Sequence, residues 1–513
     1  MNKIKWLILF LILSLAFLLG ARMILSGDFF YLFDQARDLL LVKSVAENHT
    51  LMLIGNQSGL GGFFHGPLWI YMLTPIYVIV GGNPFSLAFF YVGLELFTVF
   101  IAFIVGSKLY GSKGGLLIAL LIAMSPAIWG TVPNTVGADM EPLVYLGIFY
   151  FLVKFLRGNK NYFIPAAFLT GLALQFETAS SLVLFPTVIV MFFFGKKAIK
   201  EWHVIILSII SFVLSLTTFI LFDLRHQFLM TKAILHSFSG SEKGKGYLYL
   251  PERALDHLRG LSGVYKEVLF NQSNLMVLLL VIIFVFAAIL IFKNKKYQFR
   301  KEFLLLLSFP ILPFVFFMFY PYAVWPEYVF GLMVPVVLAF FMAISEVWKN
   351  VFGKALVLLF FIITFLNVFV FLQNQYFARA QTVDSAGSYV NQKAVAAWIY
   401  RDAEGKPAGK FGYFVYTPEI YTQGMDYLMQ WYGGKDQTIL LENQKHVTTY
   451  LILYPHLAND NGAYDFWKKN VVRTQGQVIL SKTFYGGITV QKLSIGANEP
   501  PVDPNYYQGL IFR

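Results

Sequence analysis

Three charged side chains gather shortly after the first apolar stretch of this chain. In the segment FDQARD, Asp34, Arg37 and Asp38 stand at positions i, i+3 and i+4, so on a helix they share one face. A carboxylate so placed can take a proton from an attacking hydroxyl, and a guanidinium can bind a phosphate through two hydrogen bonds. The simpler interpretation is an ion pair on an exposed helix, but charge beside a membrane is costly and is usually kept for function. Asp28 is interpreted as a helix-end residue or a supporting partner.

Further polar residues stand at the ends of apolar runs along the rest of the chain. His65 precedes Gly66-Pro67, while Asp139 and Glu141 stand where the chain returns to an apolar run. Each has a simpler explanation: a solvated histidine in a turn, or an acid that caps a helix and stabilises it by about 1 kcal/mol. The other candidates are Glu177, Arg225, His226 and Glu327. An interfacial anchor or a turn explains each of these equally well.

Composition places all these residues in a membrane protein. Of the 513 residues, 57% are hydrophobic and 13% are charged, and the mean hydropathy is +0.63. A soluble globular protein carries roughly twice that share of charge, about 25%. Repeated apolar runs predict transmembrane helices, and the net charge of +12 is typical of basic cytoplasmic loops rather than of nucleic-acid binding.

Basic clusters between the apolar runs predict the orientation, since short cytoplasmic loops are rich in lysine and arginine. About eleven spans are predicted, with the N-terminus inside and the C-terminus outside. They lie near residues 6–24, 85–106, 115–131, 141–156, 162–177, 179–195, 203–222, 274–292, 303–320, 328–346 and 352–372. The short segment 67–82 contains two prolines and is expected to lie along the outer surface or to re-enter. All the candidate residues then face outward, and the helix around Asp34 can rest Leu39, Leu40, Val42 and Val45 against the membrane.

The chain changes character after the last predicted span. Beyond residue 376 it mixes polar and apolar residues, with strand-like runs KFGYFVYTP and TTYLILYP and a closing strand pair in SKTFYGGITVQKLSIG. Helix-like stretches accompany the two runs. The predicted fold class is mainly α: a polytopic membrane domain over residues 1–376 with surface helices in its first outer loop. A small extracytoplasmic α/β domain with a Pro-rich tail follows over residues 377–513.

The motifs that the sequence lacks narrow the chemistry. It contains no P-loop, no G-x-G-x-x-G, no H-E-x-x-H and no cysteine. An outward site without nucleotide machinery favours a substrate that is activated elsewhere, such as a sugar linked to a lipid phosphate. The phosphate of such a donor needs arginine or a cationic histidine, and its acceptor needs a carboxylate base.

Four segments resemble the family 39 glycosyltransferases of the GT-C fold, which include the protein O-mannosyltransferases and the bacterial aminoarabinose transferases. DQARDLLLVKSVAEN is similar to the acidic signature near the end of the family's first helix, and FHGPLWIYML to its H/K-P-P-L surface helix. GADMEPLVYLGIFYFLV stands where the family often carries an acid at the start of its fourth span. GLALQFETASSLVLFP is similar to the recurring G-L-A-x-x-x-K segment that ends in proline. The resemblance covers roughly residues 1–345.

This resemblance implies roles for individual residues. Asp34 matches the catalytic aspartate that takes a proton from the acceptor, and Asp139 matches a second acid that shapes the site. Arg37 matches a position that contacts the lipid phosphate, and His65 matches the basic residue before Pro-Leu. Substrate binding is the role predicted for the remaining candidates Asp38, Glu141, Glu177, Arg225, His226 and Glu327. The chain departs from the family pattern at Gln35, Gly66 and Glu177, where Glu, Pro and Lys are usual.

The implied activity is transfer of a sugar from a polyprenyl-phosphate donor to an acceptor at the extracytoplasmic face of the plasma membrane. The expected partners are the lipid-linked sugar, membrane lipids and an acceptor that is a protein, a lipid or a glycan, and no nucleic acid. No cofactor or metal site is predicted, although dependence on a divalent cation stays open. The main alternative is a transporter or polymerase of polyprenyl-linked glycans, which predicts charge at mid-membrane depth rather than at helix ends. A receptor that uses its C-terminal domain is a third alternative.

Overall fold

The computed structural model forms two compact units. It describes residues 2–58, 63–132, 134–194, 201–239, 248–268, 274–293, 300–320, 324, 326–377, 384–403, 411–418, 421–433, 444–455, 462–496 and 498–504. The helical unit comprises Met1–Ala21, Leu51–Trp69 and Phe90–Leu372. The sheet unit comprises Arg22–Thr50, Ile70–Phe89 and Gln373–Arg513. The sheet unit therefore contains, besides the predicted C-terminal domain, the helix that carries Asp34.

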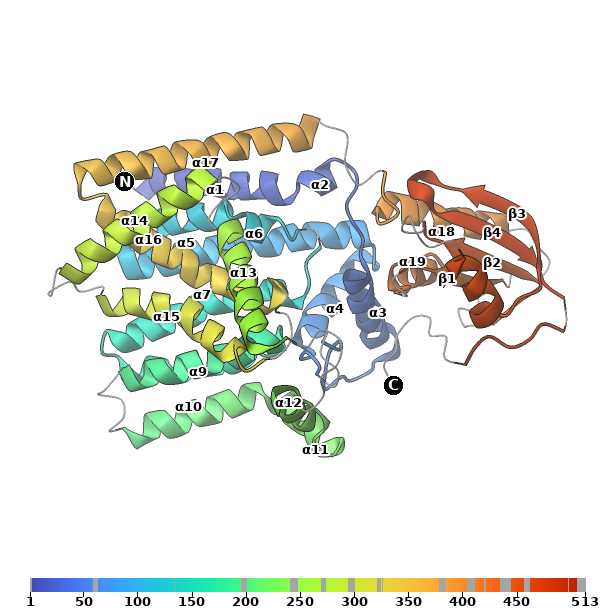
Figure 1. Cartoon of the computed structure of the whole chain (residues 1–513), viewed down its shortest axis with the longest axis horizontal. Helices are drawn as coiled ribbons and strands as arrows, with labels where there is room; N and C mark the ends of the chain where they lie inside the picture. Colours follow the sequence, from blue (N-terminus) through green and yellow to red (C-terminus); the bar gives the residue numbers. More distant parts are fainter. Residues whose placement is uncertain are drawn as a thin grey trace. The chain divides into compact units, whose positions relative to one another are not determined.

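Apolar helices make up most of the helical unit. They are α1 (Asn2–Gly20), α5 (Pro84–Ala123), α6 (Pro126–Trp129), α7 (Glu141–Leu156), α8 (Phe163–Ala173), α9 (Thr178–Phe194), α10 (Trp202–Ser215), α11 (Thr217–Arg225), α12 (Leu229–Ser239), α13 (Leu250–Val268), α14 (Asn274–Lys293), α15 (Arg300–Phe317), α16 (Met333–Val347) and α17 (Val351–Phe377). Short 3-10 helices η1 (Gly137–Met140), η2 (Lys160–Tyr162) and η4 (Pro326–Leu332) connect some of them. In Figure 1, α7, α9 and α10 run nearly parallel, and α8 packs against all three.

Each of the eleven ranges predicted to cross the membrane overlaps a helix, while the number of crossings stays a prediction. Within the described part of the chain, five helices are long and apolar enough to span a bilayer, as expected of an integral membrane protein. Their spans are Lys3–Gly20, Pro84–Ala123, Leu275–Lys293, Tyr328–Val347 and Val351–Asn374. The pair α10 and α11, bent by 62°, adds a sixth if the two form one broken span.

The long helix α5 is a hairpin of two arms. Its backbone leaves the helical region at Gly111, where φ is +79°, a value that glycine adopts without strain. A Cβ on Gly106 would lie 2.8 Å from Cα of Gly115, so the two arms touch through glycines. This break lies between the predicted spans 85–106 and 115–131.

An ion pair ties three helix ends together at the end of α7 opposite Glu141. Arg157 binds Glu302 through two nitrogens, with Nε 2.7 Å from Oε1 and Nη2 3.1 Å from Oε2. The Tyr110 hydroxyl donates to the same carboxylate at 2.9 Å. Because α7 runs from Glu141 to Leu156, the residues predicted to face outward and the basic residues predicted to face inward occupy opposite ends of this helix.

The sheet unit contains a four-stranded sheet of order β1-β2-β4-β3, formed by β1 (Gly412–Tyr416), β2 (Thr448–Leu453), β3 (Gln477–Thr483) and β4 (Thr489–Ser494). The pair β1 and β2 is parallel, and the other pairs are antiparallel. The helices of this unit are α2 (Arg22–Leu25), α3 (Phe33–Asn48), α18 (Tyr389–Ala403), α19 (Gln423–Gly433) and α20 (Ala463–Phe466), with most of α4 (Leu68–Val80). The predicted strands and helices of the α/β domain are confirmed.

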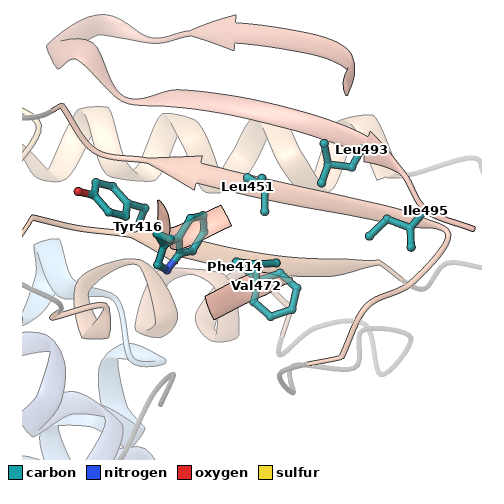
Figure 2. Packing of buried hydrophobic residues seen from close by; sticks show 7 residues of the cluster. Phe414, Tyr416, Leu451, Val472, Leu493 and Ile495 are labelled. Atoms are coloured by element: carbon teal, nitrogen blue, oxygen red, sulfur yellow. The ribbon is translucent and has the colours of Figure 1, made fainter. Parts of the chain in front are cut away.

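One hydrophobic cluster stabilises this sheet. Figure 2 shows Phe414, Leu451 and Leu493, which come from three adjacent strands, gathered with Val472 and Ile495. All are buried, and Phe414, Leu451 and Leu493 have no exposed surface. Burying side chains of this size stabilises a fold by about 1.5–3 kcal/mol each. This cluster gives the C-terminal part of the sheet unit a hydrophobic core of its own.

Candidate active site

The first part of the candidate site lies on α3 in the sheet unit. Arg37 Nη1 lies 2.8 Å from Asp34 Oδ1, and Arg37 Nη2 lies 3.4 Å from Asp38 Oδ1. The predicted grouping of these three side chains is confirmed. The Asp34 side chain is 37% exposed and that of Asp38 only 3%. Asp34 is therefore the carboxylate of this group that is accessible from outside, whereas Asp38 holds Arg37 from the buried side.

Gln35, one of the three residues that depart from the family pattern, closes the first turn of α3. Gln35, at the third helical position, accepts a hydrogen bond from the backbone N–H of Leu32 at 3.1 Å. A side chain at this position that reaches back to the residue before the helix fixes where the helix begins. Gln35 can therefore cap the helix as a glutamate would, and this hydrogen bond fixes the backbone conformation next to Asp34.

One expectation for α3 is wrong. Leu39, Leu40 and Val42, which were expected to lie against the membrane, are 1%, 3% and 0% exposed, and α3 packs against α19. The ring of Phe33 also stacks on Tyr421 with centroids 4.4 Å apart. An apolar stripe at helical spacing predicts that one face is buried, but it does not distinguish lipid from protein as the neighbour.

A separate group of candidate residues lies in the helical unit, around His65. His65 Nδ1 is 3.8 Å from Glu177 Oε2, and the two side chains are 13% and 6% exposed. The hydroxyl of Thr178 donates to the carbonyl of Phe64 at 3.0 Å. The segment that carries His65 is therefore held against the turn between α8 and α9, and Glu177 gives His65 a carboxylate partner.

Gly66 lies where the same two segments touch most closely. A Cβ on Gly66 would fall 1.9 Å from Oε1 and 2.7 Å from Cα of Gln175, so no side chain fits there. Gln175 is buried and donates to the carbonyl of Ser215 at 2.9 Å. The departures from the family pattern at Gly66 and Glu177 thus occur on two facing segments, where Gly66 meets Gln175 and Glu177 meets His65.

Glu141 lies in a buried hydrogen-bond network. Its side chain has no exposed surface, and it accepts hydrogen bonds from the Ser180 hydroxyl, from the Ser181 hydroxyl at 3.4 Å and from the Gly331 N–H at 3.0 Å. A Cβ on Gly331 would lie 2.5 Å from the ring of Tyr145. The carboxylate therefore ties the start of α7 to α9 and η4.

Asp139 lines a cavity of about 30 Å³ in the helical unit. One of its oxygens, Oδ2, accepts the N–H of Val136 at 2.7 Å and so caps η1, as the simpler interpretation expects. The cavity is also lined by Glu95, Thr98 and Thr135, among other residues. Hydroxyls and carboxylates facing one space can bind a polar ligand.

Sequence reasoning missed Glu95. This glutamate is 5% exposed and interrupts the apolar first arm of α5. The helix α1 makes room for it, because a Cβ on Gly20 would lie 1.8 Å from Oε2 of Glu95. The available signal was an acid inside an apolar run, which by default indicates a functional residue in a membrane protein.

Arg225 and His226 lie at the surface, at the end of α11. The His226 ring stacks on Phe222 with centroids 4.1 Å apart, and Phe222 in turn contacts Phe64, next to His65. The side chain of Glu327 lies outside the described residues. Within the described ranges, no group of three or more His, Asp or Glu side chains is arranged to hold a metal ion.

The chain is similar to known proteins in its fold rather than in its sequence. No protein-family model and no curated protein matches the chain. Among solved structures, ArnT from Cupriavidus metallidurans matches both bound to undecaprenyl phosphate, with a TM-score of 0.59 and 11% identity, and in the apo state, with 0.61 and 12%. Both alignments cover 96% of this chain and 98% of that one. The chain has the GT-C fold.

The likeness to ArnT covers 96% of the chain, so it includes most of the sheet unit as well as the helical unit. An oligosaccharyltransferase from Archaeoglobus fulgidus also matches, with 12% identity over 82% of this chain and 61% of that one and a TM-score of 0.47. At 11–12% identity, the likeness to ArnT establishes the fold and leaves the roles of individual residues to be argued from their own geometry.

Proposed function

We propose that this GT-C protein is a membrane glycosyltransferase that moves a sugar from a polyprenyl-phosphate donor to an acceptor at the extracytoplasmic face. The observation that carries the proposal is the cluster on α3, where a partly exposed carboxylate and a guanidinium lie 2.8 Å apart. Support comes from the full-length likeness to ArnT, whose structure was solved bound to undecaprenyl phosphate. A base and a phosphate-binding cation are the two groups that such a transfer needs.

In the proposed reaction, Asp34 takes the proton of the acceptor hydroxyl or amine as the acceptor attacks the anomeric carbon. The bond from that carbon to the phosphate oxygen breaks, and the polyprenyl phosphate leaves with the bonding electron pair. Arg37 and His65 are the cations assigned to the phosphate, where they stabilise the charge that develops on it. A single displacement of this kind inverts the configuration at the anomeric carbon.

Carboxylates are proposed to support this chemistry from two sides. Asp38 keeps one nitrogen of Arg37 occupied, so the guanidinium stays anchored when its other nitrogens turn to a phosphate. Asp139 is assigned to the sugar, because it matches the second acid that shapes the site in the family that the sequence resembles and because nearby carboxylates stabilise a transition state with oxocarbenium character. The exposed Arg225 and His226, and Glu327, are assigned to the outer part of the substrate site.

The proposal is tested by turnover of purified protein with a panel of undecaprenyl-phosphate-linked sugars, measured as release of undecaprenyl phosphate. We expect Asp34→Asn to lower kcat by about 10²–10⁴-fold, the usual contribution of a general base. The matched control is Asp223→Asn, whose carboxylate accepts the N–H groups of Met230 and Thr231 at 2.8 and 3.1 Å and so caps α12. Full turnover by Asp34→Asn would show that the base is misassigned.

Of the transporter and the polymerase in the alternative interpretation, a specific observation favours the transporter of lipid-linked glycans. Glu95 is a buried acid inside an apolar helix, which is the placement that a transport pathway predicts. Proteoliposomes loaded with a lipid-linked glycan separate the two functions. A transporter moves the glycan between leaflets and releases no polyprenyl phosphate, and Glu95→Gln would stop this movement while Asp34→Asn would not.

A further inference from the structure

The segment just before α3 pairs with the C-terminal domain as a short strand. Phe30 and Ser388 form an isolated antiparallel bridge. The Tyr31 N–H donates to the Gly387 carbonyl at 2.8 Å, and the Tyr389 N–H donates to the Phe29 carbonyl at 2.9 Å. The backbone that leads into the proposed base is therefore bonded to residues more than 350 positions later in the chain.

Asp28 is the centre of this junction. It is 3% exposed and accepts hydrogen bonds from the Ser388 hydroxyl at 2.6 Å, the Val390 N–H at 3.2 Å and the Phe29 N–H at 2.8 Å. Ser388 also caps α18, because its Oγ accepts the N–H of Asn391 at 3.2 Å. The carboxylate thus lies at the N-terminus of α18, where the free N–H groups and the helix dipole favour negative charge.

Contacts continue from Asp28 to the residue next to Asp34. The ring of Tyr389 stacks on Phe29 with centroids 5.0 Å apart, and the side chain of Gln392 donates to the Tyr31 carbonyl at 2.9 Å. Phe33 then stacks on Tyr421, as described above. Every residue from 28 to 33 except Leu32 is held by at least one such contact with the C-terminal domain.

The helix α19 of the C-terminal domain also forms hydrogen bonds with the loop that follows α4. The Tyr427 hydroxyl donates to the Gly82 carbonyl, and Trp431 Nε1 donates to the Gly81 carbonyl at 2.9 Å. The two helices α3 and α4 are also joined to each other, since the Tyr77 hydroxyl donates to Glu47 at 2.8 Å. The C-terminal domain is therefore bonded both to the segment before α3 and to the loop after α4, the helix that is hydrogen-bonded to α3.

We infer that the C-terminal domain positions the proposed base, and that Asp28 is the positioning residue through which it acts. This inference rests on the proposed function and deepens it, because it gives the domain a task in the same reaction. Asp28 does not touch the reacting atoms; it fixes the backbone path that delivers Asp34. Misplacing a reacting group by about 1 Å costs on the order of 10²-fold in rate.

The test compares Asp28→Asn with Asp402→Asn in the full-length protein. Asp402 is a matched control, because its carboxylate accepts hydrogen bonds from Lys492 and Tyr450 within the same domain. We expect Asp28→Asn to lower kcat by about 100-fold, with KM for the donor changed by less than about threefold. Asp402→Asn should leave both constants near those of the unmodified protein.

Amide hydrogen exchange at residues 33–38 gives a readout that does not need activity. We expect exchange there to rise in Asp28→Asn and to stay unchanged in Asp402→Asn. If the unmodified protein shows no transfer, the proposed function fails, and the exchange result then tests only whether Asp28 fixes the backbone of residues 33–38. Unchanged exchange at residues 33–38 in Asp28→Asn would overturn the inference.

A cross-link supplies the rescue experiment, since the chain has no cysteine. The bonds on either side of the Phe30–Ser388 bridge mark it as a non-hydrogen-bonded pair, for which the Cα atoms lie about 4.5 Å apart. That spacing suits a disulfide. In the Asp28→Asn background, oxidised Phe30→Cys/Ser388→Cys should recover most of the lost kcat and reduction should remove it again. Equal rates in both states would count against positioning.

Discussion

We expect the Glu141→Ala variant to lose thermal stability while keeping its turnover number. In the folded protein, the substitution leaves the Gly331 N–H and the Ser180 hydroxyl without their carboxylate partner. A buried group that loses its partner costs about 1–3 kcal/mol, and the vacated space adds to this, so the total is about 3–5 kcal/mol. For a chain of 513 residues, such a loss lowers the apparent melting temperature by about 3–5 °C.

The assay is thermal unfolding in detergent, followed by steady-state kinetics at a temperature where the variant is folded. Glu201→Ala is the control, because Glu201 also carries an ion pair but lies near the surface, where such pairs are worth about 0–1 kcal/mol. Glu141→Gln should fall between the two, since its amide keeps one acceptor oxygen. An unchanged melting temperature with a tenfold higher KM for the donor would refute this reasoning and would favour the substrate-binding role predicted from the sequence.

Two further predictions concern a glycine and the tyrosines of the sheet unit. Gly66→Ala should lower both the melting temperature and the turnover number. Adding Gln175→Ala should restore them only in part, because the new Cβ also meets Cα of residue 175 at 2.7 Å. Full recovery in the double variant would contradict this clash with the backbone. Burial and the Asp402 carboxylate raise the pKa of Tyr450, and burial raises the pKa of Tyr464 to about 12. Because these folded-state pKa values exceed the unfolded value of 10.0, their contribution to stability is complete below pH 10 and is lost as pH rises. We expect the sheet unit to unfold in alkali, as measured by circular dichroism, with a weaker pH dependence in Tyr450→Phe; an equally steep profile in that variant would contradict the assignment.

The order and type of the elements followed from the sequence because they depend on local patterns. Long apolar runs gave helices, and the strands β1 and β2 came from short runs rich in aromatic and apolar residues. The grouping of Asp34, Arg37 and Asp38 was predictable for the same reason, since helical spacing alone brings them together. The side of the membrane that the candidate residues face remains a prediction.

Features that depend on distant parts of the chain could not be predicted in this way. The pairing of Phe30 with Ser388 leaves no local pattern, and neither does the fit of Gly66 against Gln175. The apolar stripe on α3 was expected to face lipid but packs against α19, and this could not be predicted because α19 comes nearly 400 residues later. Glu95 was a different kind of miss, since its signal was present as a single acid in an apolar run.

The hydrogen bond from Ser388 to Asp28 joins residues 360 positions apart, and this separation sets the order of events during biosynthesis. A ribosome must translate the chain past residue 388, and the tail must reach the same side of the membrane as the first loop, before residues 28–33 can take their final path. Contacts between such distant residues form late in folding. A nascent chain that is still being inserted therefore carries α3 without its anchor, and the proposed catalysis would begin only after residue 388 has been translated and has reached the first loop.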